Sequence, residues 1–440
     1  MKTGILERIF YLRERGTSIR TELLAGTTTF ITLAYIIFVN PGILSDAGIP
    51  KEAAIAATIY AAALATLLMG LWANLPVAVA PGMGLNAFFA YYVVGKLHLP
   101  WQVGLGAVFF SGLLFLLLTV TKVRQAIIRA VPDNLKAAIG VGIGLFIAFI
   151  GLKNAGIVVA DKSTFVTTGN LTDSSVLLAI IGLLVTALLM ARGVRGAILI
   201  GIMFTTLLGM LTGQVSLPAK ISDIISLKVP SLAPTFMKLD IAGAWEFGLL
   251  NIIFTFTMVE LFDNIGTLIG VTRKAGLMDE EGNVENLGRA LTVDAFGTII
   301  SAVFGTTTVT SYIESAAGVA EGGKTGLTAV TVGILFLVAL FFAPLIALVP
   351  AFATAPALIL VGVLMFTEIR HIKLDDFTEV FPAFMTIIMM PLTFSIASGF
   401  AFGFVSYVLV KLLAGRAREV SPVMWIVSAA FIVNFYLRLH

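Results

Sequence analysis

Carboxylic acids interrupt stretches of this sequence that are otherwise apolar. Glu260 and Asp263 lie in the run Phe256–Asn264, and Glu314 directly follows a run rich in threonine. Glu260 and Asp263 are three residues apart, so on a helix they share one face. A carboxylate held away from water without a cation takes up a proton more readily. These acids therefore indicate proton handling inside an apolar environment, and the alternative is structural hydrogen bonding to neighbouring helices.

The remaining acids and the aromatic residues give weaker signals. Asp263 either contributes to proton coupling or orients Glu260, whereas Asp294 and Glu321 lie near the ends of apolar runs and fit interface or capping positions. Aromatic rings next to the acids would stack on a flat heteroaromatic ligand, or would simply pack in the core. The aromatic candidates are Phe88, Phe89, Phe262 and Tyr312.

Other kinds of chemistry lack the necessary residues. The chain has no cysteine, and its three histidines, at positions 98, 371 and 440, fall in predicted loops or at the C-terminus. No His-Glu-x-x-His motif, phosphate-binding glycine loop or acid-rich metal cluster occurs in the sequence. We therefore expect no catalytic residue, no bound metal and no cofactor. A membrane enzyme or a channel is correspondingly disfavoured.

The composition shows what kind of chain must position these acids. Of its 440 residues, 58% are hydrophobic and 12% are charged, whereas soluble domains carry roughly 25% charged residues. This excludes a soluble enzyme and a disordered chain, and a net charge of +3 is too small to indicate a nucleic acid partner. The sequence predicts an all-α polytopic membrane protein surrounded by lipid.

Apolar runs between polar breaks predict fourteen spans, because each run is long enough to cross the bilayer core. The predicted spans are residues 22–42, 52–74, 77–95, 101–121, 136–153, 175–191, 196–213, 243–270, 290–304, 306–322, 326–348, 353–368, 378–394 and 396–414. With the N-terminus inside, every arginine except Arg438 falls in an inner segment, as the positive-inside rule requires. The apolar segment 421–437 either spans the membrane or lies at its interface.

The first and eighth spans run in opposite directions, which points to an inverted repeat. A constant offset of 228 residues (275 − 47) relates Ala47-Gly48 to Ala275-Gly276 and Asn86 to Glu314. The sequence therefore predicts two inverted halves of seven spans, joined by residues 214–242.

Two spans are poor continuous helices. The third contains Pro81, Gly82 and Gly84, and the tenth contains threonines and Ser311 just before Glu314. Proline removes a backbone donor, and β-branched residues favour extended backbone. Breaks at corresponding positions of two halves indicate the midplane site of a transporter. The alternative is a pair of kinks that serve packing only.

Long segments of the sequence resemble a known family. They are TELLAGTTTFITLAYIIFVNP at 21–41, NLPVAVAPGMGLNAFFAYYVVG at 74–95, ELFDNIGTLIGVTRKAGL at 260–277, TTTVTSYIESAAGVAEGGKTGLTAVTVG at 306–333 and VPAFATAPALILVGVLM at 349–365. The chain resembles the purine permeases of the nucleobase:cation symporter group, in the AzgA-like branch that carries adenine, guanine and hypoxanthine. The similarity runs almost from end to end.

The resemblance implies the uracil-permease-type fold, with short β-strands in the breaks of the third and tenth spans. Residues 1–121 and 243–348 would form a core domain, residues 122–242 and 349–414 a gate domain, and residues 415–440 a C-terminal apolar segment. The two acids of the family's site correspond to Glu260 and Glu314. Some relatives have aspartate at the position of Glu260, which leaves the preferred purine open.

Together, residues and resemblance predict proton-coupled import of adenine, guanine or hypoxanthine across the plasma (inner) membrane by alternating access. The expected coupling residues are Glu260, Asp263 and Glu314. The expected substrate-binding residues are Glu260, Glu314, Asn86, Phe262, Tyr312, Ser311, Ala87 and Phe88. Xanthine, uracil or an anion as substrate, Na⁺ as coupling ion, and a homodimer are left open.

Overall fold

The computed structural model describes residues 5–121, 123, 127, 130–246, 250–278 and 284–439 of the chain. It is mostly helical, and its buried apolar side chains form one large cluster that runs through most of the helices. Ten helices of the described residues are long and apolar enough to cross a membrane. This confirms the prediction of a polytopic, predominantly helical membrane protein.

The elements of the first half, in chain order, are α1 (Ile5–Phe10), α2 (Ile19–Leu33), α3 (Ile36–Asp46), α4 (Lys51–Leu68), η1 (Met69–Ala73), β1 (Val79–Pro81), α5 (Met83–Ala87), η2 (Phe88–Lys96), α6 (Trp101–Val120), α8 (Asp133–Asn154), β2 (Val158–Asp161), β3 (Phe165–Thr168), α9 (Ser174–Ala191), α10 (Ala197–Leu211) and η3 (Ile221–Asp223).

The elements of the second half are α11 (Ile241–Glu246), α12 (Leu250–Lys274), α13 (Leu287–Phe304), β4 (Val309–Ser311), α14 (Ser315–Ala320), α15 (Gly326–Ala339), η4 (Leu340–Phe342), α16 (Ala343–Leu348), α17 (Ala351–Phe366), η5 (Thr367–His371), α18 (Phe377–Thr393), α19 (Ile396–Leu413), η6 (Ala417–Glu419) and α20 (Pro422–Leu439).

The breaks in the third and tenth predicted spans are real. In each span the chain runs as a three-residue strand, β1 or β4, before a short helix begins. The two strands pair antiparallel, with Val79 opposite Ser311 and Pro81 opposite Val309. Each strand is short, but together they satisfy backbone groups that would otherwise be unpaired inside the bundle.

The first predicted span is confirmed as one apolar segment, Ile19–Asp46, with a local irregularity near its middle. The structure divides residues 22–42 between α2 and α3, with Ala34 and Tyr35 at the junction. The amide of Ile37 donates to the carbonyl of Ala34 over 3.2 Å, a tighter turn than an α-helical one. Pro41 lies inside α3 and lacks the N–H that would bond one turn back. The helix is therefore locally tightened in the middle of the span, while Ala34 and Tyr35 keep right-handed helical backbone.

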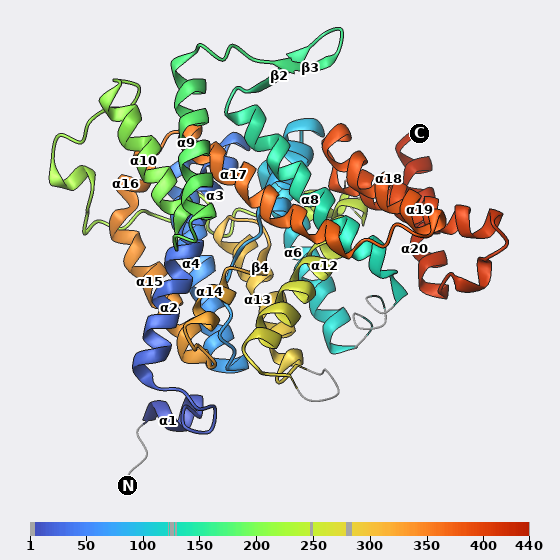
Figure 1. Cartoon of the computed structure of the whole chain (residues 1–440), viewed down its shortest axis with the longest axis horizontal. Coiled ribbons are helices and arrows are strands. Elements are labelled where there is room, and N and C mark those ends of the chain that lie inside the picture. Colours follow the sequence, from blue (N-terminus) through green and yellow to red (C-terminus); the bar gives the residue numbers. More distant parts are fainter. Residues whose placement is uncertain are drawn as a thin grey trace.

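Two groups of helices pack mainly among themselves. In one group α8 packs against α17 and α18, α18 packs against α19, and α9 packs against α10. In the other group α13 packs against α6 and α4, and α15 packs against α4 and α2. The β1–β4 pair lies within the second group, where it contacts α4, α12 and α13. Figure 1 shows β4 near the middle of the molecule, enclosed by helices.

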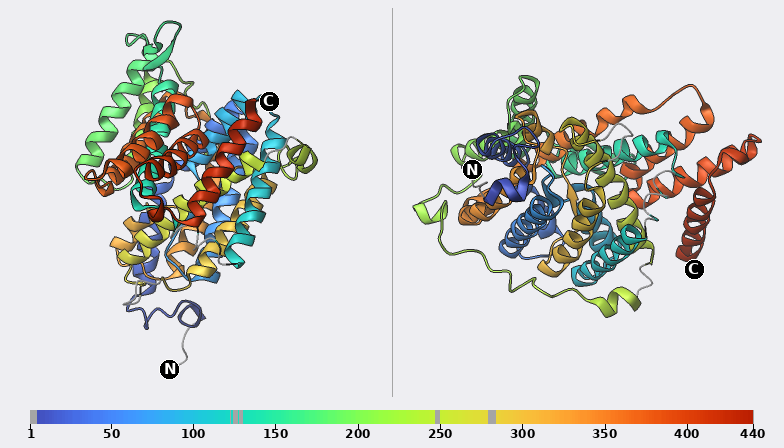
Figure 2. Two further views of the ribbon diagram at one scale, coloured as in Figure 1. Left: turned by 90° about the vertical axis from the view of Figure 1, so that its right-hand side faces the viewer. Right: turned by 90° about the horizontal axis from the view of Figure 1, so that it is seen from below.

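The two ends of the bundle carry different loops. The N-terminal helix α1 lies at one end, and the hairpin of β2 and β3 projects from the opposite end (Figures 1 and 2). The C-terminal helix α20 packs on α19, and its Phe431 ring lies 5.2 Å from that of Phe254 in α12. The C-terminal apolar segment is therefore a helix that bridges both groups.

Candidate functional site

The crossing of β1 and β4 brings several buried polar groups together. The amide of Tyr312 donates to the carbonyl of Ala78 over 2.9 Å, and that of Gly82 donates to the carbonyl of Thr308 over 3.0 Å. The amide of Val79 reaches the hydroxyl of Thr66 over 2.9 Å. The extended backbone is thus satisfied within the protein, as a segment at membrane depth requires.

Glu260 lies in the middle of α12 with no exposed surface. The hydroxyl of Thr298, on the neighbouring helix α13, donates to Glu260 Oε1 over 2.5 Å. The two residues belong to the long helices beside the broken spans, so their backbones are held by regular helical hydrogen bonds. This acid is enclosed by protein on all sides.

Glu314 lies between β4 and α14, where the backbone turns from strand to helix. Its Oε1 accepts a hydrogen bond from the hydroxyl of Tyr35 over 2.5 Å, a separation typical of a strong, charge-assisted bond. Tyr35 is only 1% exposed, whereas Glu314 is partly exposed and its neighbour Ile313 is 51% exposed. A buried hydroxyl therefore holds the carboxyl of Glu314, on a residue that keeps some exposed surface.

Asn86 belongs to a buried network rather than to an open surface. Its Nδ2 donates to Oδ1 of Asn40 over 2.5 Å, and its Oδ1 accepts from the hydroxyl of Thr307. Asn40 Nδ2 donates in turn to the hydroxyls of Thr58 and Thr306, over 2.8 and 3.1 Å. The network ties the first and second predicted spans to both breaks.

Ser311 and Tyr312 also form hydrogen bonds within the protein. The amide of Ser311 donates to Asn264 Oδ1 over 2.6 Å, and its hydroxyl donates to Asp294 Oδ1 over 3.2 Å. The hydroxyl of Tyr312 donates to the carbonyl of Pro81 over 2.5 Å. These donors hold the crossing together in this structure.

The predicted stacking residues separate into two environments. Phe88 is fully buried and stacks on Tyr92, with ring centroids 5.0 Å apart and planes 13° apart. Ala87, one residue before it, is 1% exposed. Phe262 is partly exposed and lies 6.0 Å from the ring of Phe400 in α19. Phe262 is thus the predicted aromatic that borders accessible space.

The side chain of Asp263 lies outside the described residues, although its backbone belongs to α12. Its predicted coupling role therefore stays a prediction. One turn further along, a Cβ added at Gly266 would meet nothing within 4 Å, and at Gly270 it would meet only Ile313 at 3.6 Å. This exposed strip of α12 leads away from Phe262 and Glu314 toward the end of the bundle that holds the N-terminus.

Sequence reasoning misplaced or missed several polar residues. Asp294 was expected near a span end, but it lies well inside α13 and is fully buried. Glu22, which drew no prediction, is also buried, and it accepts hydrogen bonds from the amides of Lys324 and Thr328, over 2.9 and 3.2 Å. It thereby caps the start of α15. Glu321, expected at an interface, pairs with Arg195.

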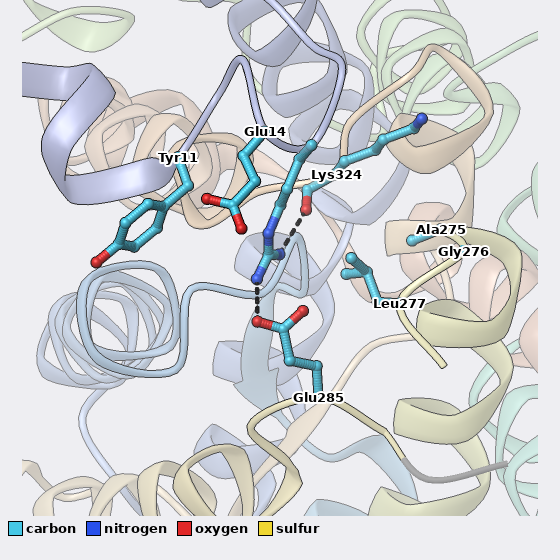
Figure 3. Close-up of a pocket in the computed structure, with 8 residues that line it drawn as sticks. Tyr11, Glu14, Ala275, Gly276, Leu277, Glu285 and Lys324 are labelled. Carbon is cyan, nitrogen blue, oxygen red and sulfur yellow. Dashed lines mark hydrogen bonds and ion pairs between the residues drawn. The ribbon is translucent and has the colours of Figure 1, made fainter. Parts of the chain in front are cut away.

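A separate cavity of about 580 Å³ lies at the end of the bundle that holds the N-terminus (Figure 3). Arg15 crosses it, and its guanidinium donates to the carbonyls of Asn74 and Lys324, over 3.1 and 2.9 Å. It also pairs with Glu285 over 2.6 Å. Arg15 therefore fastens the N-terminal segment to three loops of the bundle. This cavity is lined by neither Glu260 nor Glu314.

Interrupted helices that cross around buried carboxyls, inside a bundle of apolar helices, define an integral membrane transporter. The comparisons with known proteins agree. Residues 20–402 match the model of the Permease family, Xan_ur_permease. The chain belongs to this family, and it is an integral, multi-pass membrane protein and not an enzyme.

Curated relatives cover almost the whole chain. It is 49% identical over 431 residues to adenine permease AdeP of Escherichia coli, covering 98% of this chain and 96% of that protein. It is 45% identical over 441 residues to guanine/hypoxanthine permease PbuG of Bacillus subtilis, covering 98% of this chain and 99% of that protein. These permeases confirm the family resemblance drawn from the sequence.

Solved structures support the fold. The transmembrane domain of the cyanobacterial bicarbonate transporter BicA superposes with a TM-score of 0.66 at 15% identity, covering 86% of this chain and 97% of that domain. Murine Slc26a9, an anion transporter in the inward-facing state, superposes with a TM-score of 0.65 at 9% identity, covering 94% of this chain and 73% of that chain. At these identities the likeness concerns the fold alone.

Proposed function

We propose that this chain imports a purine nucleobase (adenine, guanine or hypoxanthine) by proton symport across the plasma (inner) membrane. The observation that carries the proposal is Glu314, a partly exposed acidic residue at the crossing of two broken helices. The chain's identity of 49% to an adenine permease and 45% to a guanine/hypoxanthine permease supports a purine as the ligand.

Glu314 and Glu260 suit two different steps of transport, binding of the base and coupling to the proton. Purine rings carry N–H groups in the ring plane, and Glu314 offers a carboxyl that such a group can reach. Phe262, the partly exposed aromatic of α12, is the ring on which we expect a flat base to stack. Glu260 is enclosed and bonded to Thr298, so it is the group that takes up and releases the coupled proton.

The buried residues among the predicted substrate-binding set support the proposed site from the protein interior. Asn86 holds the two breaks in register through Asn40 and Thr307. Ser311 and Tyr312 fix the strand that leads to Glu314. Ala87 and Phe88 form the packed start of the helix after β1. A change in the size of these residues would alter the space left for the base.

Alternating access requires two bodies that move relative to each other. We assign the group around β1 and β4 to a core domain (residues 1–121 and 243–348) and the α8, α17, α18 and α19 group to a gate domain (residues 122–242 and 349–414). Fourteen spans in two inverted halves are consistent with this packing. Where Gly84 of the core faces the gate, an added Cβ would lie 2.7 Å from Ile143. Apolar, close-fitting contacts of this kind allow sliding without breaking hydrogen bonds.

The predicted orientation assigns one end of the bundle to the cytoplasm. Arginines, among them Arg15 and Arg195, lie in segments that the positive-inside rule assigns to the cytoplasm together with the N-terminus. The exposed strip formed by Gly266 and Gly270 would then open toward the cytoplasm. We infer an inward-facing arrangement in which the base leaves along this strip.

The test is uptake by purified protein in proteoliposomes with an imposed pH gradient. We expect radiolabelled adenine, guanine or hypoxanthine to accumulate above equilibrium, and a protonophore to abolish the accumulation. Glu260→Gln should abolish concentrative uptake, and a Glu260→Gln protein that still accumulates the base normally would contradict the assignment. Competition by xanthine, uracil or an anion, or a requirement for Na⁺, would identify the alternatives.

A further inference from the structure

The first span lies beside the crossing at the junction of α2 and α3, where Tyr35 contacts Glu314. The amides of Phe38 and Val39 donate to the carbonyl of Tyr35 over 3.0 Å each. One turn beyond, Asn40 is fixed by its bonds to Thr58 and Thr306. The backbone that carries Tyr35 is therefore held on both sides of its side chain.

The side chain of Tyr35 is directed at one atom of the proposed site. Its ring is buried, with 1% of its surface exposed, and its hydroxyl lies 2.5 Å from Glu314 Oε1. These residues lie on different spans, 279 positions apart in the chain. A buried ring has little rotational freedom, so the hydroxyl fixes where the carboxyl can lie.

The two residues of this contact, Tyr35 and Glu314, differ in exposure. The tyrosine approaches from the protein interior, whereas Glu314 and its neighbour Ile313 have exposed surface. A carboxylate has two oxygens and about four acceptor positions. One hydrogen bond from behind thus restricts the orientation of the group but leaves acceptor capacity for a ligand in front.

We infer that Tyr35 is a positioning residue for ligand recognition, because its hydroxyl anchors the Glu314 carboxyl in the orientation that receives an N–H group of the base. The inference rests on the proposed function. It assigns a role in the site to the first span, outside the two broken spans that the sequence singles out.

The experiment compares Tyr35→Phe with the wild-type protein, full length and purified, by calorimetric binding of adenine, guanine and hypoxanthine and by uptake kinetics. We expect Tyr35→Phe to weaken binding of the preferred base by about 10-fold or more, since a hydrogen bond to a charged group is lost. KM should rise to a similar extent, while the maximal rate stays within about twofold of wild type. Tyr60→Phe, a half-buried tyrosine of α4 against Phe304, is the matched control and should bind as wild type does.

A melting curve in detergent shows whether the Tyr35→Phe protein folds. If it does not fold, a second variant tests the inference. Glu314→Asp keeps Tyr35 but draws the carboxyl back by one methylene, and it should weaken binding to a similar extent. Combining both changes should cost little more than either alone, because both remove the same contact. Unchanged affinity in Tyr35→Phe, or in Glu314→Asp if Tyr35→Phe does not fold, would overturn the inference. A wild-type protein that binds none of the three bases would instead overturn the proposed function.

Discussion

Two groups of carboxyls in this protein are stabilised in different ways. At the crossing, Glu260 and Glu314 accept hydrogen bonds from neutral hydroxyls, those of Thr298 and Tyr35. At the end of α19, by contrast, Lys411 pairs with three carboxylates, those of Glu419, Glu379 and Asp376, over 2.7, 3.0 and 3.6 Å.

The second region, the Lys411 cluster, is a network of ion pairs. Arg416 adds hydrogen bonds to Asp376 and Glu419, over 2.7 and 2.6 Å. Hydrogen bonds from Thr378 and Arg416 hold the pKa of Asp376 well below its usual range. Hydrogen bonds from Arg416 and Lys411 lower the pKa of Glu419 to about 2. These acids stay charged at physiological pH and serve to fasten α18, α19 and the start of α20.

The contrast shows what neutral partners contribute at the crossing. A cation beside a carboxylate occupies its acceptor positions and prevents protonation, which suits a fastening point. A hydroxyl stabilises the carboxyl without cancelling its charge, so the group can still bind a proton or a ligand N–H. Ion pairs thus hold the carboxyls that keep their charge, and hydroxyls hold the carboxyls that are proposed to bind a proton or the base during transport.

The largest effect that we expect from this contrast is on binding. Glu314→Gln keeps the shape of the side chain but removes its charge, and it should weaken binding of the preferred purine by about 100-fold. Calorimetry on the purified protein measures this loss. Glu368→Gln, at an exposed position, is the control. If Glu314→Gln keeps wild-type affinity, the carboxyl at the crossing has no role in binding that the Lys411 cluster lacks.

An intermediate effect concerns the stability of the Lys411 cluster. Lys411 has no exposed side-chain surface, so Lys411→Met would leave three carboxylates facing one another with only Arg416 nearby. We expect the melting temperature in detergent to fall by several degrees, with affinity for the base unchanged within about twofold. The exposed Lys228→Met provides the control. A loss of affinity that exceeds the loss of stability would show that the cluster takes part in binding.

The smallest effect is a dependence of stability on pH. The pKa of Glu419 lies below its unfolded value of 4.5, at about 2 in the folded protein. Its contribution to stability is therefore complete above the unfolded pKa and is lost as pH falls toward the folded pKa. Melting curves from pH 7 to about pH 3 should show a decline that Glu419→Gln reduces. An identical decline in both proteins would argue against the contribution of Glu419.

Sequence reasoning placed the helices well because apolar runs between charged loops are a local signal. Each predicted span falls on a helix or on a broken segment, and the strands at 79–81 and 309–311 lie at the breaks that proline and threonine residues predicted. The family assignment was equally accessible, since long motifs survive in the sequence.

The contacts between residues of the site could not be predicted from such local sequence patterns. Tyr35 lies in an apolar run with no glycine or proline at the junction of α2 and α3, and Pro41 comes after the junction. The partner of its hydroxyl comes from another span, so no spacing rule connects them. Asp294 was misplaced because the polar start of α13 made the span look shorter than the helix is. Phe88 and Asn86 are adjacent to the break, yet tertiary packing turned them inward.

The pairing of β1 with β4 has a consequence for how the protein is made. When the first half enters the membrane, the backbone of Val79–Pro81 has no strand to pair with, because Val309–Ser311 has not yet been synthesised. Unpaired backbone groups are costly in lipid. The first half must therefore wait in an incomplete state, and the crossing can close only late in synthesis. A chain truncated before β4 should remain a target for membrane quality control.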